Sequence, residues 1–157
     1  LPLMPKFGMK MHINPEMDMI TWYGKGIHEN YPDRKSSEFI GLYTLPLDEF
    51  AVSYPAPQEN GNRCDVRWMS FSDGNVNLRI DGIQPLCFRA WPWSEEDIEN
   101  AGHPHELPER DFINVNIDLN IHGVGCNDGW GARTLDKYTI DGNRPYSYGF
   151  IMSCEEL

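Results

Sequence analysis

The stretch at residues 113–133 reads INVNIDLNIHGVGCNDGWGAR and decides the fold, because it contains the longest alternating pattern in the chain. From residue 113 to residue 122 apolar and polar side chains alternate, and only an extended strand converts a period of two into one apolar face. The apolar positions are Val115, Ile117, Leu119 and Ile121, and the polar positions are Asn114, Asn116, Asp118, Asn120 and His122. We therefore predict a β-strand whose polar face is solvated or forms an interface, with a sugar-binding row of amides as the alternative.

A glycine-rich loop follows this strand. Gly123, Gly125, Gly129 and the Asn127–Asp128 pair all tolerate positive φ, and the loop presents one large ring, Trp130. Trp130 could fold back into the core, as most tryptophans do. It could instead remain outside as a stacking platform, since a rigid indole offers a sugar ring a large contact area at small entropic cost.

Two further motifs stand out, WYGKGIHENYPDR at residues 22–34 and ENGNRCDVR at residues 59–67. Together with the loop NDGWG at residues 127–131 and the segment 3–9, they resemble the small-chain portion (domain 5) at the C-terminus of bacterial β-galactosidases of glycoside hydrolase family 2. The resemblance covers nearly the whole chain, with the motifs in the same order and spacing. Two positions depart from the family, which commonly has Gly at Cys126 and Ser at Gly129.

The resemblance implies a role for the loop, because the family's Trp reaches from this domain into the active site of a separate barrel and stacks on the substrate. Trp130 is thus the predicted substrate-binding residue, and Asp128 and Asn127 shape its loop. The remaining motif residues either line a sugar face or, in the favoured interpretation, bind one another and loop amides to hold the structure together. These residues are Glu29, Asn30, Asp33, Arg34, Asn60, Arg63 and Arg67.

No catalytic residue is predicted in this chain. Retaining glycoside hydrolysis needs two carboxyl groups about 5–5.5 Å apart, and in the family these glutamates lie on the upstream barrel domain. We therefore expect the parent β-galactosidase to be the enzyme and this fragment alone to be inactive. The sequence also predicts no cofactor here: His103-Pro104-His105-Glu106 lacks a third strong metal ligand, and the magnesium and sodium that the resemblance implies belong to the barrel.

Charge and composition limit the partners. A formal net charge of −11 argues against nucleic acid and anionic membranes, since no basic patch could release counterions from phosphates. No apolar run approaches membrane-spanning length. By resemblance the expected partners are the upstream domains of the same chain, a galactoside substrate and further copies of the parent in a homo-oligomer. The bacterial cytoplasm and the periplasm both remain open as compartments.

Short strands at regular intervals, with one short helix near residues 94–101, predict an all-β, antiparallel two-sheet sandwich. The resemblance sharpens this to the supersandwich of galactose mutarotases, as a single domain over residues 1–157. We expect it to be incomplete at its N-terminal side, because family domains are considerably longer. The length of 157 residues with 40% hydrophobic residues suffices for one core.

Local patterns predict which strands pair. We expect a hairpin between residues 9–13 and 17–24, a long loop with a short extended piece over 45–61, paired strands over 63–71 and 75–81, a separate strand over 86–91, and a closing hairpin between 137–140 and 146–152. Ser94 should cap the helix. The four cysteines form no metal or redox motif and are expected to be free thiols.

Two other functions compete with the β-galactosidase domain. A free-standing carbohydrate-binding module would be expected to begin with its own complete sandwich. A mutarotase-like aldose epimerase would need a His and a Glu on one concave face, and the sequence shows no convincing pair.

Overall fold

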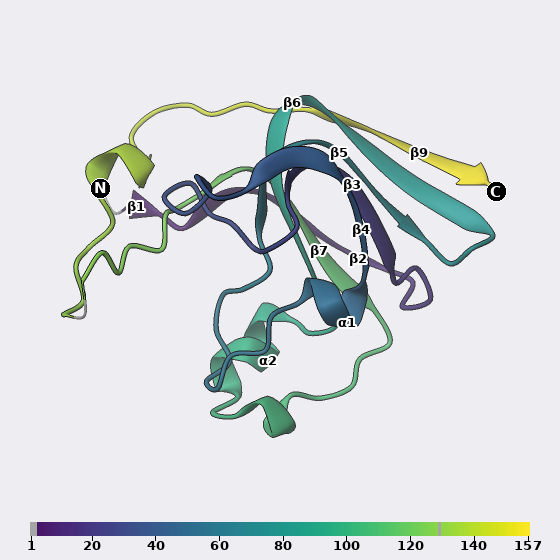
Figure 1. Cartoon of the computed structure of the whole chain (residues 1–157), viewed down its shortest axis with the longest axis horizontal. Coiled ribbons are helices and arrows are strands. Elements are labelled where there is room, and N and C mark those ends of the chain that lie inside the picture. Colours follow the sequence, from purple (N-terminus) through teal and green to yellow (C-terminus); the bar gives the residue numbers. More distant parts are fainter. Residues whose placement is uncertain (1–2, 129) are drawn as a thin grey trace.

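The computed structural model describes residues 3–128 and 130–157, which form an all-β fold with antiparallel sheets (Figure 1). The strands are β1 (Leu3–Met4), β2 (Lys6–Ile13), β3 (Met19–Gly26), β4 (Phe39–Pro46), β5 (Arg63–Ser72), β6 (Val76–Trp91), β7 (Ile113–Ile121), β8 (Ile140–Asp141) and β9 (Phe150–Glu156). The helical segments are α1 (Leu47–Phe50), α2 (Glu95–Asn100), η1 (Pro104–Glu106) and η2 (Asp136–Tyr138). The predicted all-β class with a short helix is confirmed.

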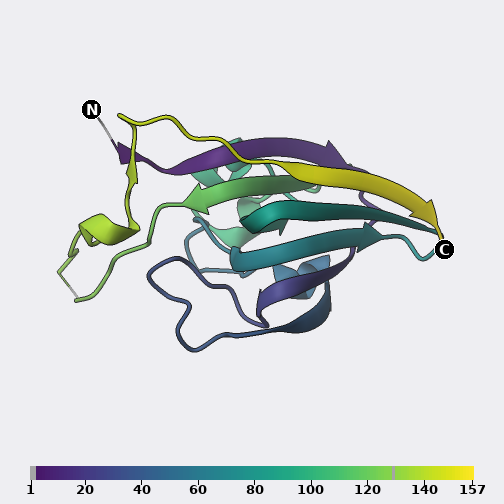
Figure 2. The same cartoon turned by 90° about the horizontal axis from the view of Figure 1, so that it is seen from above.

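Seven strands form one large antiparallel sheet in the order β2-β7-β6-β5-β3-β4, and β9 pairs with β6 off this path. Strands β1 and β8 form a second, two-stranded sheet. Strand β6 changes partner along its length: Val76–Gly82 pair with β9, and Cys87–Trp91 pair with β7. Figure 2 shows the long strands of the large sheet from above, with the turn region between β7 and β8 at one end and the end of β9 at the other.

Strand β7 lies where the sequence predicts it, between β2 and β6, and its apolar face joins the core. Ile113, Val115 and Ile117 are fully buried in a cluster with Trp22 and Phe88. Burying these side chains stabilises the sheet at about 25 cal/mol per Å² of apolar surface. This face therefore anchors β7 and sets the point at which the Trp130 loop leaves the sheet.

The polar face of β7 is buried as well, so the expectation of a solvated face is wrong for Asn114, Asn116 and Asp118. The segment after β6 folds back over this face. Arg89 Nη2 donates to Asn116 Oδ1 and to Glu95 Oε1, each at 2.8 Å, and Asn114 Nδ2 donates to Glu95 Oε2 at 3.1 Å. Buried polar groups need partners, and Glu95 at the start of α2 is the partner of Arg89 Nη2 and Asn114 Nδ2.

The turn and cap predictions are confirmed. Strands β5 and β6 pair around Gly74, whose φ is +89°, and Asp73 Oδ1 accepts bonds from the Asn75 and Val76 amides. Ser94 caps α2, because its hydroxyl accepts from the Asp97 amide while Asp97 accepts from the Ser94 amide. The segment predicted as a separate strand over 86–91 is instead the continuation of β6.

Both predicted terminal hairpins are wrong. Strands β2 and β3 form but do not pair: β2 lies at one edge beside β7, and β3 lies between β4 and β5. At the C-terminus β8 pairs with β1, and β9 pairs with β6. The alternating pattern predicts a strand and which of its faces is apolar. It does not predict the partner strand, because that choice depends on the apolar area that each possible pairing buries.

Residues 39–61 differ from the sequence prediction in two ways. Strand β4 was not predicted, and the segment after it contains the helical turn α1 in place of a short extended piece. Strand β4 lies at the edge of the sheet and ends at Pro46. Proline has no backbone N–H to donate, and an edge strand can accommodate this loss. Within the described residues no helix has the length and hydropathy needed to cross a membrane.

Candidate functional site

Trp130 lies on the loop that leaves the end of β7, and its side chain is 94% exposed. The interpretation of Trp130 as a core residue is therefore wrong. Asp128 fixes the local backbone, because Asp128 Oδ1 accepts hydrogen bonds from the Trp130 amide at 2.8 Å and the Ala132 amide at 3.1 Å. Asn127 lies exposed beside them, and Gly129 is outside the described residues.

The base of this loop uses backbone conformations that favour glycine. Gly125 and Gly131 have φ of +68° and +80°, and Cys126 has φ of +57°. Non-glycine residues adopt this region at a cost of roughly 1–2 kcal/mol. The loop conformation is therefore held by its surroundings as well as by its own residue types.

Asp33 provides the main link between the loop and the rest of the chain. Its carboxylate accepts from the Val124 amide at 3.0 Å and from the Gly125 amide at 2.7 Å. A Cβ on Gly123 would lie 2.7 Å from the same carboxylate, so only glycine allows this approach. Thr134 closes the loop from its other side, donating to the Gly123 carbonyl at 2.7 Å. The first motif thus positions the Trp130 loop.

Glu29 joins the first motif to the second. Its carboxylate accepts from the Gly61 amide at 2.7 Å and from the Tyr54 hydroxyl. The hydrogen bond from the Tyr54 hydroxyl to Glu29 is the main cause that raises the pKa of Tyr54, to about 12, and burial is the second cause. The carboxylates of Glu29 and Asp33 therefore both accept hydrogen bonds from loop residues.

Asn30 and Asn60 are buried and satisfy backbone groups. Asn30 Oδ1 accepts from the Cys64 amide at 2.8 Å, and Asn30 Nδ2 donates to the His28 carbonyl at 3.0 Å. Asn60 Oδ1 accepts from the Val52 amide and from Trp91 Nε1, both at 3.0 Å. Neither side chain reaches a surface of this chain that a sugar could touch.

The three motif arginines lie in different surroundings. Arg63 is 1% exposed and stacks on Phe50 and Trp22, with its guanidinium carbon 4.3 and 5.3 Å from the ring centroids. Burial lowers the pKa of Arg63 to about 10. Arg67 is half-buried and lies over the Tyr23 ring at 5.8 Å, and Arg34 is exposed. The sugar-face alternative therefore fails for Arg63, which is a core residue.

The predicted site residues thus separate into two groups. Trp130, Asp128 and Asn127 are exposed on one loop, while Glu29, Asp33, Asn30 and Asn60 hold that loop and the neighbouring motif in place. The sequence interpretation missed Tyr54, which lies in the proline-rich loop and carries no local pattern pointing to Glu29. Among residues 3–128 and 130–157, no group of three or more His, Cys, Asp or Glu side chains is placed to hold a metal ion.

Comparisons with known proteins agree with the motifs. The family described as beta galactosidase small chain matches residues 2–152. The chain is 36% identical over 97% of its length to a beta-galactosidase of Priestia megaterium, and 36% identical over 98% to one of Pseudoalteromonas haloplanktis. A beta-galactosidase of Streptococcus thermophilus is 32% identical over 97% of the chain. The chain spans only 14–15% of the length of these relatives, which therefore contain other domains. The chain belongs to the beta galactosidase small chain family.

Proposed function

We propose that this chain is a non-catalytic C-terminal domain of a β-galactosidase that releases terminal non-reducing β-D-galactose, and that its Trp130 loop binds substrate at the active site of a barrel domain in the same protein. The observation that carries the proposal is the exposure of Trp130, 94%, on a loop anchored by Asp33 and Asp128. An anchored aromatic ring is suited to a ligand.

The hydrogen bonds of the carboxylates in this chain support a non-catalytic role for the domain. A retaining mechanism needs a nucleophile and an acid/base about 5–5.5 Å apart. Glu29 and Asp33, the two carboxylates of the first motif, accept hydrogen bonds from loop amides and from Tyr54 and so serve structure. We assign the catalytic pair, with the magnesium and sodium of the parent enzyme, to the barrel domain.

The sheets of this chain would belong to a larger fold in the full-length enzyme. The large sheet and its small companion would form part of a supersandwich of the galactose-mutarotase type within a glycoside hydrolase family 2 enzyme, as one domain over residues 1–157. The relatives' additional length leaves room for the barrel as a partner in the same chain. We expect the parent to assemble as a homo-oligomer.

Replacement of Trp130 by Ala in the full-length enzyme tests the proposal. Stacking one face of an indole on a sugar removes on the order of 80 Å² of apolar surface, or ~2 kcal/mol, which corresponds to a roughly 30-fold change in binding. The variant should therefore raise KM by about this factor for two galactosides with different aglycones. The effect on kcat should be smaller, because a platform that contacts ground and transition states alike provides uniform binding.

Two control variants separate stacking from folding. Trp130→Phe keeps an aromatic face and should recover most of the affinity, whereas Leu135→Ala removes another exposed apolar side chain from the same region and should leave KM unchanged. Because Trp130 is exposed, its replacement should not alter the melting temperature. Unchanged KM in Trp130→Ala would refute the substrate-binding role.

A further inference from the structure

Two cysteines that are distant in sequence lie side by side beneath the loops. Cys64 on β5 and Cys87 on β6 are both unoxidised and buried, at 1% and 5% exposure, and their Sγ atoms are 3.4 Å apart. The two strands are antiparallel neighbours, and the adjacent pair Arg63–Phe88 sets their register. Cys64 and Cys87 are the residues next to that pair on each strand, and the register of the ladder shifts between Arg63 and Val66.

The hydrogen bonds distinguish the two sulfur atoms. Cys64 Sγ accepts from the Cys87 thiol and from Asn62 Nδ2, the latter at 3.3 Å. The Cys64 thiol in turn donates to the Asn30 carbonyl, with the sulfur 3.6 Å from the oxygen. The pKa of Cys87 lies well above its ordinary value, first because its thiol donates to Cys64 and then because of burial. Because the Cys87 thiol holds its proton, we take Cys64 as the sulfur that reacts first.

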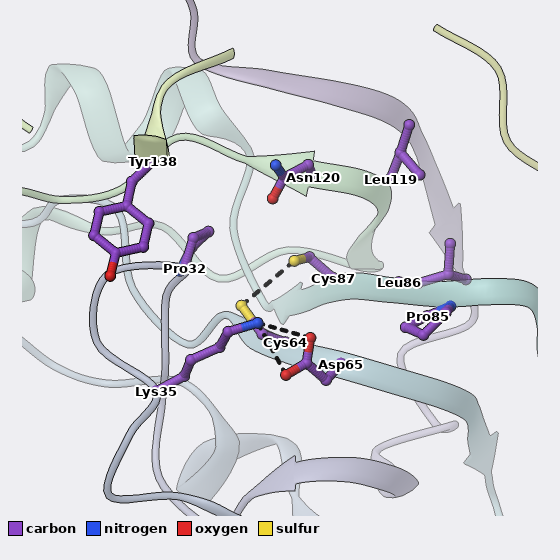
Figure 3. Close-up of a pocket in the computed structure, with 10 residues that line it drawn as sticks. All are labelled: Pro32, Lys35, Cys64, Asp65, Pro85, Leu86, Cys87, Leu119, Asn120 and Tyr138. Atoms are coloured by element: carbon purple, nitrogen blue, oxygen red, sulfur yellow. Dashed lines mark hydrogen bonds and ion pairs between the residues drawn. The ribbon is translucent and has the colours of Figure 1, made fainter. Parts of the chain in front are cut away.

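A cavity gives small molecules access to the pair. Cys64 and Cys87 line a hollow of about 220 Å³ together with Lys35, Asp65 and Tyr138. Figure 3 shows both sulfur atoms and the Lys35 amine turned toward this space. Lys35 Nζ binds both carboxylate oxygens of Asp65, at 2.8 and 2.9 Å.

Lys35 keeps its positive charge beside the sulfurs. Burial favours the neutral amine, but the hydrogen bonds and charge of Asp65, with smaller contributions from the two cysteines, outweigh burial and raise the pKa of Lys35. An ammonium group next to the pair favours negative charge on sulfur.

We propose that Cys64 and Cys87 form a dithiol site that a peroxide oxidises reversibly to an intramolecular disulfide. The Cys64 thiolate attacks one oxygen of hydrogen peroxide, the O–O bond breaks, and the departing hydroxide takes up the proton lost by Cys64 to give water. Cys87 sulfur then attacks the sulfenic acid at Cys64, the S–O bond breaks, and the hydroxide leaves with the Cys87 proton as a second water. In sum, two thiols are oxidised to one disulfide and one peroxide is reduced to two waters.

The site does not depend on the proposed role of Trp130, although the two are neighbours. Cys64 and Cys87 pack in one cluster with Tyr31 and Ile121, and Val124, whose amide Asp33 holds, lies against it. A disulfide here would join β5 to β6 directly below the base of the Trp130 loop.

The test uses the full-length protein, fully reduced and then freed of reductant. Native protein is exposed to hydrogen peroxide, quenched by alkylation under denaturing conditions, digested and analysed by mass spectrometry. We expect a linked peptide containing Cys64 and Cys87 that disappears on reduction. Cys64→Ser and Cys87→Ser should each abolish it, whereas Cys126→Ser and Cys154→Ser, which replace exposed cysteines, should leave its yield unchanged.

A second measurement needs no substitution. Phenylarsine oxide bridges two neighbouring thiols, so treatment of the native wild-type protein should protect Cys64 and Cys87 together from later alkylation while Cys126 and Cys154 remain labelled. The proposal is overturned if peroxide concentrations that fully oxidise Cys126 and Cys154 yield no Cys64–Cys87 link. It is equally overturned if the arsenical leaves both buried cysteines open to alkylation.

Discussion

Asp33 and Gly125 are 92 residues apart in the sequence, yet Asp33 Oδ2 accepts a 2.7 Å hydrogen bond from the Gly125 amide. Its other oxygen accepts from the neighbouring Val124 amide. A carboxylate that binds two consecutive amides fixes both the position and the direction of the backbone, and bonds to a charged group contribute about 1.5–3 kcal/mol each. Asp33 therefore couples the first motif to the presentation of Trp130.

Asp33→Ala in the full-length enzyme should loosen the loop while leaving Trp130 in place. We expect KM to rise by up to about tenfold, equivalent to ~1.4 kcal/mol, because part of the binding free energy is then spent on ordering the loop. Asp18→Ala, which removes an exposed carboxylate near β3, is the matched control. Steady-state kinetics on both variants would contradict the coupling if Asp33→Ala and Asp18→Ala gave the same KM.

The isolated 157-residue chain should not hydrolyse a nitrophenyl galactoside, because Glu29 and Asp33, the carboxylates of the first motif, are held by hydrogen bonds from loop amides. Release of nitrophenol is the measurement, with a Glu29→Gln preparation as the control for contaminating enzyme. Turnover that the pure chain shows and Glu29→Gln abolishes would move Glu29 into catalysis.

Stability should depend on pH through Asp118. Burial raises the pKa of this carboxyl to about 6, against the opposing charges of Lys6 and Arg89, whereas an unfolded Asp has a pKa of about 3.9. Between these values the folded chain binds more protons than the unfolded chain, so this group adds stability as the pH falls from 7 to 4. The ionised carboxylate thus costs up to about 3 kcal/mol at pH 7.

Asp118→Asn should consequently raise the melting temperature of the chain at pH 7.5, and the gain over wild type should shrink as the pH falls through 6 toward 4. Asp111→Asn, at an exposed position, is the control. Thermal melts across this pH range would contradict the inference if Asp118→Asn were destabilised more at pH 7.5 than at pH 4, since the charge would then be a net stabiliser through Lys6 and Arg89.

Ser94→Ala should destabilise α2 by about 1 kcal/mol, because the Asp97 amide loses its acceptor and the reciprocal capping box opens. Ser36→Ala, at an exposed loop position, should change stability far less. Urea denaturation provides the comparison. Equal midpoints for the two variants would show that Arg110, which also binds Asp97, maintains the helix end without the cap.

Short-range chemistry accounts for the parts of the structure that the sequence predicts correctly. Strand β7 begins and ends as its alternation predicts, the turn at Gly74 has the positive φ that glycine allows, and Ser94 caps α2. The motifs also identified the family, and Trp130 was singled out because a ring between glycines has little to pack against locally.

The tertiary structure alone decided which distant elements meet. No local pattern predicts that β2 pairs with β7 or that β9 pairs with β6. None predicts the burial of Asn116 and Asp118, or the contacts of Asp33 with Gly125 and of Cys64 with Cys87. The physical reason is that hydrophobic periodicity and turn chemistry act over a few neighbouring residues. Strand order and buried polar contacts depend instead on the apolar area that the whole chain can bury and on the hydrogen bonds that its enclosed polar groups need.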